Sequence, residues 1–399
     1  MRSQGKHVLT LLFCAASSSD MIYFCLLISS FLIAVPHFRP MNRRDFLHPG
    51  HLANTAGELL GLLNEPLPDK DSDEKDDIAL LRFSRQAMAT SFEVIFPFGI
   101  PGATQAAEAA LDEIDRIEDQ LTVYRETSEV SRLNRLAAVE PVTVTEDLFQ
   151  LLTESAQLTE QTEGAFDVAT GALIKAWGFH RRLGRVPSAP ERADVADRTG
   201  MKNILLDSKN RMIRFLKPGV EINFGSIGKG YALDQAAKQM RSRGIRNALL
   251  HGGHSSVCAI GTGPERGRGW PIGIRHPWKP DQRLATVRLK DRALGTSAAT
   301  FQHLEHEGRK LGHILDPRTC WPAENMVSAS VVAPTAALAD ALATAFFILG
   351  VDKARLYCEN HPEIAAVLLS AEESAQPVVV GSGDDPIQLA SADPTPQAT

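Results

Sequence analysis

Asp340 and Thr344 are two oxygen-bearing side chains in an otherwise apolar stretch, residues 337–350 (ALADALATAFFILG). Their i, i+4 spacing places them on one face of a helix, one turn apart. A buried carboxylate needs a partner, so Asp340 should face a cation, yet no Lys or Arg lies at helical spacing near it. A hard divalent metal held by carboxylate, hydroxyl and backbone oxygens would satisfy both side chains. Mg²⁺ is the expected ion when phosphates are the substrate.

A histidine and an aspartate lie close together in residues 312–319 (GHILDPRT). The Asp316-Pro317 pair favours a turn, so His313 and Asp316 can both be displayed at the end of a strand. A histidine exchanges a proton near neutrality, and an adjacent carboxylate favours its charged form. His313 is therefore a candidate for proton transfer. The alternative is a turn in which both side chains only cap backbone groups.

Three glycines, at 225, 228 and 230, follow an apolar segment within residues 221–234 (EINFGSIGKGYALD). A glycine-rich turn between a strand and a helix exposes backbone N–H groups where a phosphate can bind. The spacing is neither that of a Rossmann loop nor that of Walker A, because Gly228-Lys229 lacks the earlier glycine and the following Ser or Thr. Taken alone, such a turn is more often structural than phosphate-binding.

The composition is that of a globular protein. The chain has 399 residues, 42 basic and 48 acidic side chains, a net charge of −6 and 44% hydrophobic residues, which is enough chain for a substantial core. No basic field that would attract nucleic acid is present, so no nucleic-acid partner is expected. The five cysteines are too few and too widely spaced for a disulfide framework, and no Cys-x-x-Cys pair offers a zinc site.

The hydrophobic periodicity predicts three helices, at 103–121, 147–160 and 230–244. Strands are expected at 92–96, 203–206, 212–215, 248–251, 285–289 and 327–332. Helices and strands do not alternate in a regular βαβ order. The predicted fold class is therefore α+β with mostly antiparallel sheet.

The chain divides into four regions. Residues 1–40 contain an almost uncharged apolar run, 21–38, about as long as a membrane-spanning helix, which indicates a leader or anchor, or an over-extended start if Met41 is the true first residue. Residues 41–80 hold Arg43-Arg44, which is similar to a twin-arginine export signal, and an acidic linker. Residues 81–380 are the folded body, and 381–399 are a tail expected to be disordered. We expect a protein exported to the periplasmic side or anchored in the inner membrane, rather than a cytoplasmic one.

Six ordered motifs between about residue 84 and residue 370 resemble the ApbE family of FAD:protein FMN transferases. They are 87–90 (AMAT), Tyr124 with 128–134 (SEVSRLN), 164–167 (GAFD) with Gly171, 222–234 (INFGSIGKGYALD), 313–319 (HILDPRT) and 339–345 (ADALATA). The resemblance implies a two-lobed, T-fold-like body with mostly antiparallel sheets flanked by helices. It also implies an Mg²⁺-dependent enzyme that splits FAD at its pyrophosphate and releases AMP. The FMN would be attached through a phosphoester to a threonine or serine of a flavinylated electron-transfer protein, expected to be membrane-associated.

The resemblance also implies roles for individual residues. Asp340 and Thr344 match the family's metal ligands, with the backbone carbonyl of Ser226 as the third. His313 matches the histidine of phosphoryl transfer, as a base toward the threonine or as a transient acceptor. The positions that match the lining of the FAD pocket are Met88, Tyr124, Ala165, Phe166, Asp167, Asn223, Lys229 and Leu315.

Five positions depart from the family's pattern. They are Asn223 in place of an acid, His254 in place of Asp, Ala298 and Cys320 in place of Gly, and Ala343 in place of an acid that some members carry. The matching metal ligands and the histidine are retained, so the activity is still expected, with its rate and partner specificity open. Two other functions fit the same pocket: a FAD pyrophosphatase that gives FMN and AMP with water as the nucleophile, and a non-catalytic FAD-binding protein.

Overall fold

The computed structural model describes residues 79–390, apart from short gaps at 182–183, 265–266, 278, 280–281, 299–302, 373–374 and 383–386. The described chain from Leu80 onward belongs to one compact unit. The predicted leader, twin-arginine-like motif and acidic linker before residue 79 lie outside the described residues and stay predictions. In the part of the chain that is described, no helix is long and apolar enough to cross a membrane.

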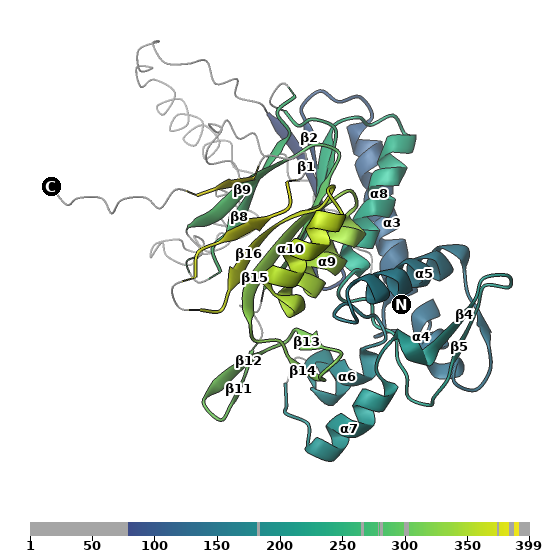
Figure 1. The fold of residues 1–399 in the computed structure, drawn as a ribbon. Helices are drawn as coiled ribbons and strands as arrows, with labels where there is room; N and C mark the ends of the chain where they lie inside the picture. Colours follow the sequence, from purple (N-terminus) through teal and green to yellow (C-terminus); the bar gives the residue numbers. More distant parts are fainter. Residues whose placement is uncertain are drawn as a thin grey trace, which may run out of the picture. The chain divides into compact units, whose positions relative to one another are not determined.

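The largest element of the fold is an eight-stranded sheet with the order β1-β2-β6-β7-β10-β15-β16-β17 (Figure 1). Every neighbouring pair runs antiparallel. The strands are β1 (Leu80–Ala87), β2 (Thr90–Pro97), β6 (Ala248–Gly252), β7 (Ser256–Ile260), β10 (Ala293–Ala298), β15 (Met326–Ala333), β16 (Ala365–Ser370) and β17 (Val378–Val380). This sheet and its helices confirm the predicted α+β class with mostly antiparallel pairing.

Four helices pack on one face of this sheet (Figure 1). They are α3 (Ala103–Leu121), α8 (Gly228–Ser242), α9 (Ala336–Leu349) and α10 (Val351–Asn360). Side chains alternate across a strand, so Phe92, Val94 and Phe96 of β2 all face the helices. Helix α9 is unusual because 11 of its 14 residues are buried. The polar side chain of Asp340 is among these buried residues.

The opposite face of the sheet is covered by a second sheet with the order β18-β9-β8. Its strands are β8 (Trp270–Arg275), β9 (Arg283–Leu289) and β18 (Ile387–Leu389), and a separate apolar cluster, which includes Ile95 of β2 and Val287 of β9, joins the two sheets. Strand β18 corrects one prediction. The sequence predicts disorder throughout 381–399, whereas Ile387 pairs with Val287 in register. Three residues are too few for a period-two pattern to be recognised in a sequence.

A second group of elements is formed by the part of the chain that lies between α3 and α8 in the sequence. It comprises α4 (Glu129–Leu136), β3 (Val142–Thr143), α5 (Glu146–Gln161), α6 (Gly171–Ala176), η3 (Phe179–Arg181), α7 (Ala189–Arg198), η4 (Met201–Asn203), β4 (Ile204–Asp207) and β5 (Met212–Phe215). Strands β3, β5 and β4 make a small antiparallel sheet. Leu133 of α4, Leu152 of α5 and Phe215 of β5 belong to the same core cluster as the helices on the main sheet. The two parts of the body therefore share one core.

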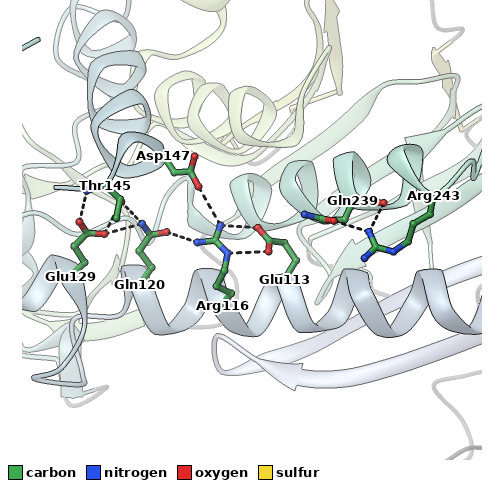
Figure 2. Close-up of polar contacts among 8 residues, drawn as sticks. All are labelled: Glu113, Arg116, Gln120, Glu129, Thr145, Asp147, Gln239 and Arg243. Atoms are coloured by element: carbon green, nitrogen blue, oxygen red, sulfur yellow. Dashed lines mark hydrogen bonds and ion pairs between the residues drawn. The ribbon is translucent and has the colours of Figure 1, made fainter. Parts of the chain in front are cut away.

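A chain of polar contacts fixes this second group to the exposed side of α3 (Figure 2). Arg116 of α3 donates to Asp147 of α5 at 3.4 Å, and Gln120 donates to Glu129 and Thr145 at 2.9 and 2.8 Å. Glu129 also accepts hydrogen bonds from the backbone N–H and the hydroxyl of Thr145. The first turns of α4 and α5 are thereby held against α3.

Two short hairpins flank His313. They are β11 (His303–His306) with β12 (Arg309–Gly312), and β13 (Leu315–Asp316) with β14 (Trp321–Pro322). Leu315 packs in a third apolar cluster with Leu173 and Trp177, which come from or adjoin α6. The indole N–H of Trp177 also donates to the Cys320 carbonyl at 3.1 Å. The segment that carries His313 therefore rests on the second group of elements.

Most predicted elements are confirmed to within two residues. The predicted helix 103–121 and the predicted strand 212–215 coincide with α3 and β5. The helix predicted at 230–244 begins two residues earlier, and the strand predicted from 203 begins at Ile204 because Asn203 ends the turn of η4. These differences are of the size by which frayed ends of elements usually vary.

Candidate active site

Asp340 lies inside the protein with 7% of its surface exposed. Its helix, α9, is in direct backbone contact with α8 on one side and β10 on the other, and two glycines permit this. A Cβ at Gly230 would lie 2.1 Å from the Ala336 carbonyl oxygen, and a Cβ at Gly295 would lie 2.4 Å from the Ala339 carbonyl carbon. Both distances are far below van der Waals contact. The close approach at these glycines sets where the Asp340 carboxylate lies.

The Asp340 carboxylate is bound by hydrogen-bond donors from two other elements. The N–H of Gly230, in α8, donates to Oδ2 at 2.9 Å, and the Ser256 hydroxyl, in β7, lies 2.8 Å from both oxygens. Burial raises the pKa of Asp340 to about 6, while the charge of Lys229 and the two donors act to lower it. Lys229 is thus one positive charge that acts on Asp340. It comes from α8, so no spacing within α9 could have revealed it.

Thr344 follows Asp340 by one helical turn and lies beside a further serine. Its Oγ1 is 3.3 Å from the Asp340 carbonyl oxygen and 3.2 Å from Ser297 Oγ of β10. The group therefore combines one carboxylate with hydroxyl oxygens, which are the ligands that a hard cation such as Mg²⁺ prefers. Among the described residues no cluster of three or more His, Cys, Asp or Glu is placed to hold a metal ion. Any ion here would depend on hydroxyl and backbone oxygens besides Asp340, and Ser226 lies in the turn immediately before α8.

Asp167 and Asn223 lie on neighbouring segments. The backbone N–H of Asn223 donates to the Val168 carbonyl at 2.8 Å, and the Asn223 side-chain oxygen accepts from the Gly225 N–H at 2.8 Å. The Asp167 carboxylate accepts two backbone N–H groups at 2.7 and 2.8 Å. Burial raises the pKa of Asp167 to about 6, and these two hydrogen bonds act to lower it. The side chains of Asp167 and Asn223 thus both accept hydrogen bonds from nearby backbone N–H groups and hold these two segments in place.

The other residues predicted to line an FAD pocket differ in exposure. Met88 and Ala89 form the two-residue turn between β1 and β2 with φ of 48° and 59°, a left-handed conformation that is strained for non-glycine residues and is found at functional sites. Tyr124 is 73% exposed in the loop after α3. Ala165 and Phe166, in contrast, are 1% and 0% exposed. The side chains of Ala165 and Phe166 pack in the core, so they support the chain next to Asp167 and are not exposed to a ligand.

His313 is half-buried between β12 and β13, beside the buried Leu315. Asp316, expected to favour the charged form of His313, has a partner that the sequence analysis did not name. Arg318 donates from Nε to Asp316 Oδ1 at 2.9 Å and from Nη2 to Oδ2 at 2.8 Å, so the guanidinium binds both carboxylate oxygens. A planar guanidinium forms such a two-point pair readily. Asp316 therefore holds the turn through Arg318.

Three residues of the site were missed by the sequence analysis: Ser256, Ser297 and Asp234. The serines face Asp340 and Thr344 because of strand register, which the sequence does not specify. Asp234 lies within the glycine-rich motif, but its partners lie on α9: it accepts the N–H groups of the first two α9 residues at 2.8 Å each. Burial, and more weakly the charge of Asp340, raises the pKa of Asp234 to about 6.

Two further residues that depart from the family's pattern, Cys320 and His254, lie in turns of the described chain. Cys320 has a φ of 56°, so a cysteine occupies a left-handed position that favours glycine. His254 lies in the turn between β6 and β7, where burial, followed by the charges of Arg275 and His251, lowers its pKa.

Comparison with known proteins identifies the family. The ApbE family model matches residues 88–368. The FAD:protein FMN transferase of Haemophilus influenzae is 29% identical over 294 residues, which cover 71% of this chain and 84% of the relative. The enzyme of the same name from Klebsiella pneumoniae is 31% identical over 264 residues, covering 64% and 79%.

Solved structures share the fold. The ApbE protein of Thermotoga maritima superposes with a TM-score of 0.68 at 30% identity, covering 76% of this chain and 97% of that one. The apo form of Pseudomonas stutzeri flavinyl transferase ApbE gives a TM-score of 0.66 at 25% identity, covering 78% and 96%. With the family model matching more than half of its length, this chain belongs to the ApbE family.

Proposed function

We propose that this protein is a FAD:protein FMN transferase, an enzyme that moves FMN from FAD to a threonine or serine of a partner flavoprotein and releases AMP. The relatives that carry this name support the proposal. The observation that carries it is the buried Asp340 carboxylate, which lies with Thr344, Ser256 and Lys229 at the junction of α8, α9 and the main sheet. A protein that only packed this junction would have no need of a buried charge.

Mg²⁺ is the proposed metal. Asp340 and Thr344 would hold it together with the backbone carbonyl of Ser226, a set of hard oxygen ligands that fits this ion. When bound, the ion would neutralise charge on the pyrophosphate of FAD and on the departing phosphate. Lys229, whose charge acts on Asp340, would supply a positive charge in addition to that of the ion.

The transfer exchanges the phosphoanhydride bond of FAD for a phosphoester bond to the acceptor. The hydroxyl oxygen of the acceptor threonine forms a bond to the FMN phosphorus, and the bond from that phosphorus to the bridging oxygen breaks. AMP leaves with the bridging oxygen, and His313 takes the hydroxyl proton. A histidine is suited to this because its neutral form is available near pH 7.

The acceptor is proposed to be an electron-transfer flavoprotein at the membrane, and the site of action the periplasmic side. The apolar run 21–38 and the Arg43-Arg44 pair support this location. Changing Arg43 and Arg44 to Lys should retain the protein in the cytoplasm if the arginine pair is the export signal. Unchanged export would instead point to residues 21–38 as the working signal or anchor.

The function is tested with the purified full chain, FAD and Mg²⁺, with and without a membrane electron-transfer flavoprotein that carries a Ser/Thr-rich flavinylation motif. Covalent FMN on the acceptor, with one AMP released per FMN attached, is the expected result. FMN and AMP formed equally without an acceptor would establish the pyrophosphatase alternative. FAD binding with no turnover would establish the binding-protein alternative.

Asp340→Asn is the decisive variant. The neutral amide removes the charge that would hold the metal, so the variant should fold, bind no Mg²⁺ at the site and lose FAD cleavage. Asp352→Asn, the same chemical change at an exposed position of α10, serves as the control and should retain full activity. Full activity of Asp340→Asn would eliminate the proposed site.

A further inference from the structure

Helices α8 and α9 exchange hydrogen bonds in both directions. Asp234 of α8 accepts the N–H of Ala336 on Oδ1 and the N–H of Ala337 on Oδ2, each at 2.8 Å. One turn earlier in α8, the N–H of Gly230 donates to Asp340 Oδ2 at 2.9 Å. Residues four apart lie on one face of a helix. The two contacts are therefore the two ends of one antiparallel seam between α8 and α9.

The contact made by Asp234 is more than a helix cap. Helix α9 already has its own N-cap, Thr335, whose hydroxyl accepts the N–H of Leu338 at 3.3 Å. The Asp234 carboxylate belongs to another helix, so its two hydrogen bonds fix where α9 begins relative to α8. Gly230 allows the close approach, because a Cβ there would lie 2.1 Å from the Ala336 carbonyl oxygen.

We infer that Asp234 is a positioning residue for the metal site: its two hydrogen bonds to the start of α9 set the place of Asp340 relative to Ser226, in the turn before α8, and Lys229, in the first turn of α8. The inference rests on the proposed function, in which Asp340 and the Ser226 carbonyl hold one ion. Ser226 and Lys229 move with α8, whereas Asp340 and Thr344 move with α9. A shift between the two helices would separate the ligands without removing any of them.

The test compares Asp234→Asn with Thr335→Ala. The asparagine keeps the size of the side chain but replaces one acceptor oxygen with a donor, so one α9 N–H loses its partner. Thr335→Ala removes a cap of the same helix that does not reach α8. Both variants should lower the melting temperature. Binding of Mn²⁺, used as a spectroscopic probe for Mg²⁺, is measured by electron paramagnetic resonance on the full chain.

We expect Asp234→Asn to weaken Mn²⁺ binding by ~10-fold or more, the usual scale when a group that orients a metal ligand is removed. Thr335→Ala should stay within about twofold of the wild type, since its cap does not touch α8. In the transfer assay, Asp234→Asn should raise the Mg²⁺ concentration for half-maximal rate, and excess Mg²⁺ should restore the rate while FAD affinity stays unchanged.

Equal Mn²⁺ affinity of the two variants would overturn the inference and leave Asp234 a structural cap. If Asp234→Asn gives no folded protein, Asp234→Glu replaces it: both acceptor oxygens remain but lie one methylene farther out, and wild-type Mn²⁺ affinity in it likewise overturns the inference. A wild-type chain that binds no Mn²⁺ removes both the metal site and the role of Asp234. A wild-type chain that binds Mn²⁺ but transfers no FMN contradicts the proposed function alone, because the binding comparison still decides this inference.

Discussion

The Ser256 hydroxyl lies 2.8 Å from both carboxylate oxygens of Asp340, and Ser256 itself is fully buried. A hydroxyl has one proton, so Ser256 donates to one carboxylate oxygen at a time. The equal distances mean that either oxygen of Asp340 can accept that proton. With the Gly230 N–H, the Ser256 hydroxyl is one of two hydrogen-bond donors that stabilise the ionised form of Asp340. Ser256 therefore helps to keep a charge inside the protein that burial alone would neutralise.

Ser256→Ala should lower the free energy of unfolding of the metal-free protein by about 1–3 kcal/mol at pH 7, because a buried carboxylate loses a donor. Urea unfolding would measure the loss. Ser255→Ala is the matched control, since the hydroxyl of Ser255 makes no hydrogen bond to the carboxylate among the described residues and lies 3.4 Å from Ser256 Oγ. Its effect should be within about 0.5 kcal/mol. Similar losses at the two serines would show that Ser256 does not stabilise the carboxylate.

His313→Ala tests the proposed proton transfer separately from binding. The variant should keep its affinity for FAD within a fewfold but lower the rate of FMN transfer by at least ~10²-fold, the scale for losing one positioned proton-transfer group. FAD titration calorimetry and the transfer assay on one preparation provide both quantities. A structural histidine would give the opposite pattern, with lower stability and weaker FAD binding but near-normal turnover of bound FAD.

The sequence predicts the helices and strands well where a periodic pattern is long. Helix α3 has eight buried residues on one stripe, and its predicted bounds coincide with the observed ones. Strand β18 was missed because its three residues gain their order only from pairing with β9. The fold class was predictable because the order of helices and strands along the chain can be predicted from the sequence. The order of strands within the sheet was not, because it depends on contacts between residues distant in sequence.

The candidate site was only half predictable, for a related reason. Asp340 and Thr344 are recognisable because polar residues in an apolar helix need an explanation. Ser256 and Lys229, which act on Asp340, come from β7 and α8, and only the packing of the chain brings them to α9. The pairing of Asp316 with Arg318, two residues farther on, was also not anticipated, because the two-point geometry of this pair depends on the turn that brings them together.

Asp167 should make stability depend on pH in a narrow window. Burial raises the pKa of Asp167 from 3.8 to about 6, so between about pH 4 and 6 the unfolded chain releases its proton while the folded chain keeps it. The unfolded state then binds fewer protons, and stability falls as the pH rises through this window. Below and above the window this group contributes no slope.

The variant Asp167→Asn isolates that contribution. The free energy of unfolding of the wild type minus that of the variant should fall by roughly 2–3 kcal/mol between pH 3.5 and pH 7. The asparagine also loses one acceptor for a backbone N–H, which shifts the difference by a constant. Urea unfolding at a series of pH values would show this, and a difference that stays level with pH would contradict the raised pKa.

Cys320 offers a test of backbone strain at a position where the family has glycine. Its φ of 56° is in the left-handed region, which costs a residue with a Cβ about 1–2 kcal/mol. Cys320→Ala and Cys320→Gly both remove the buried thiol, but only glycine relieves the strain. The glycine variant should therefore be more stable than the alanine variant by about 1 kcal/mol, as measured by urea unfolding.

The same two substitutions at Cys358 provide the control. Cys358 is also buried, but it lies within α10 and therefore has a helical backbone, where alanine is favoured over glycine by about 1 kcal/mol. The order of stability of the two variants should therefore reverse between the two cysteines, although the atoms removed are the same. Alanine proving more stable than glycine at both positions would mean that the left-handed conformation of Cys320 carries no strain, and that relief of strain does not explain the glycine usual there in the family.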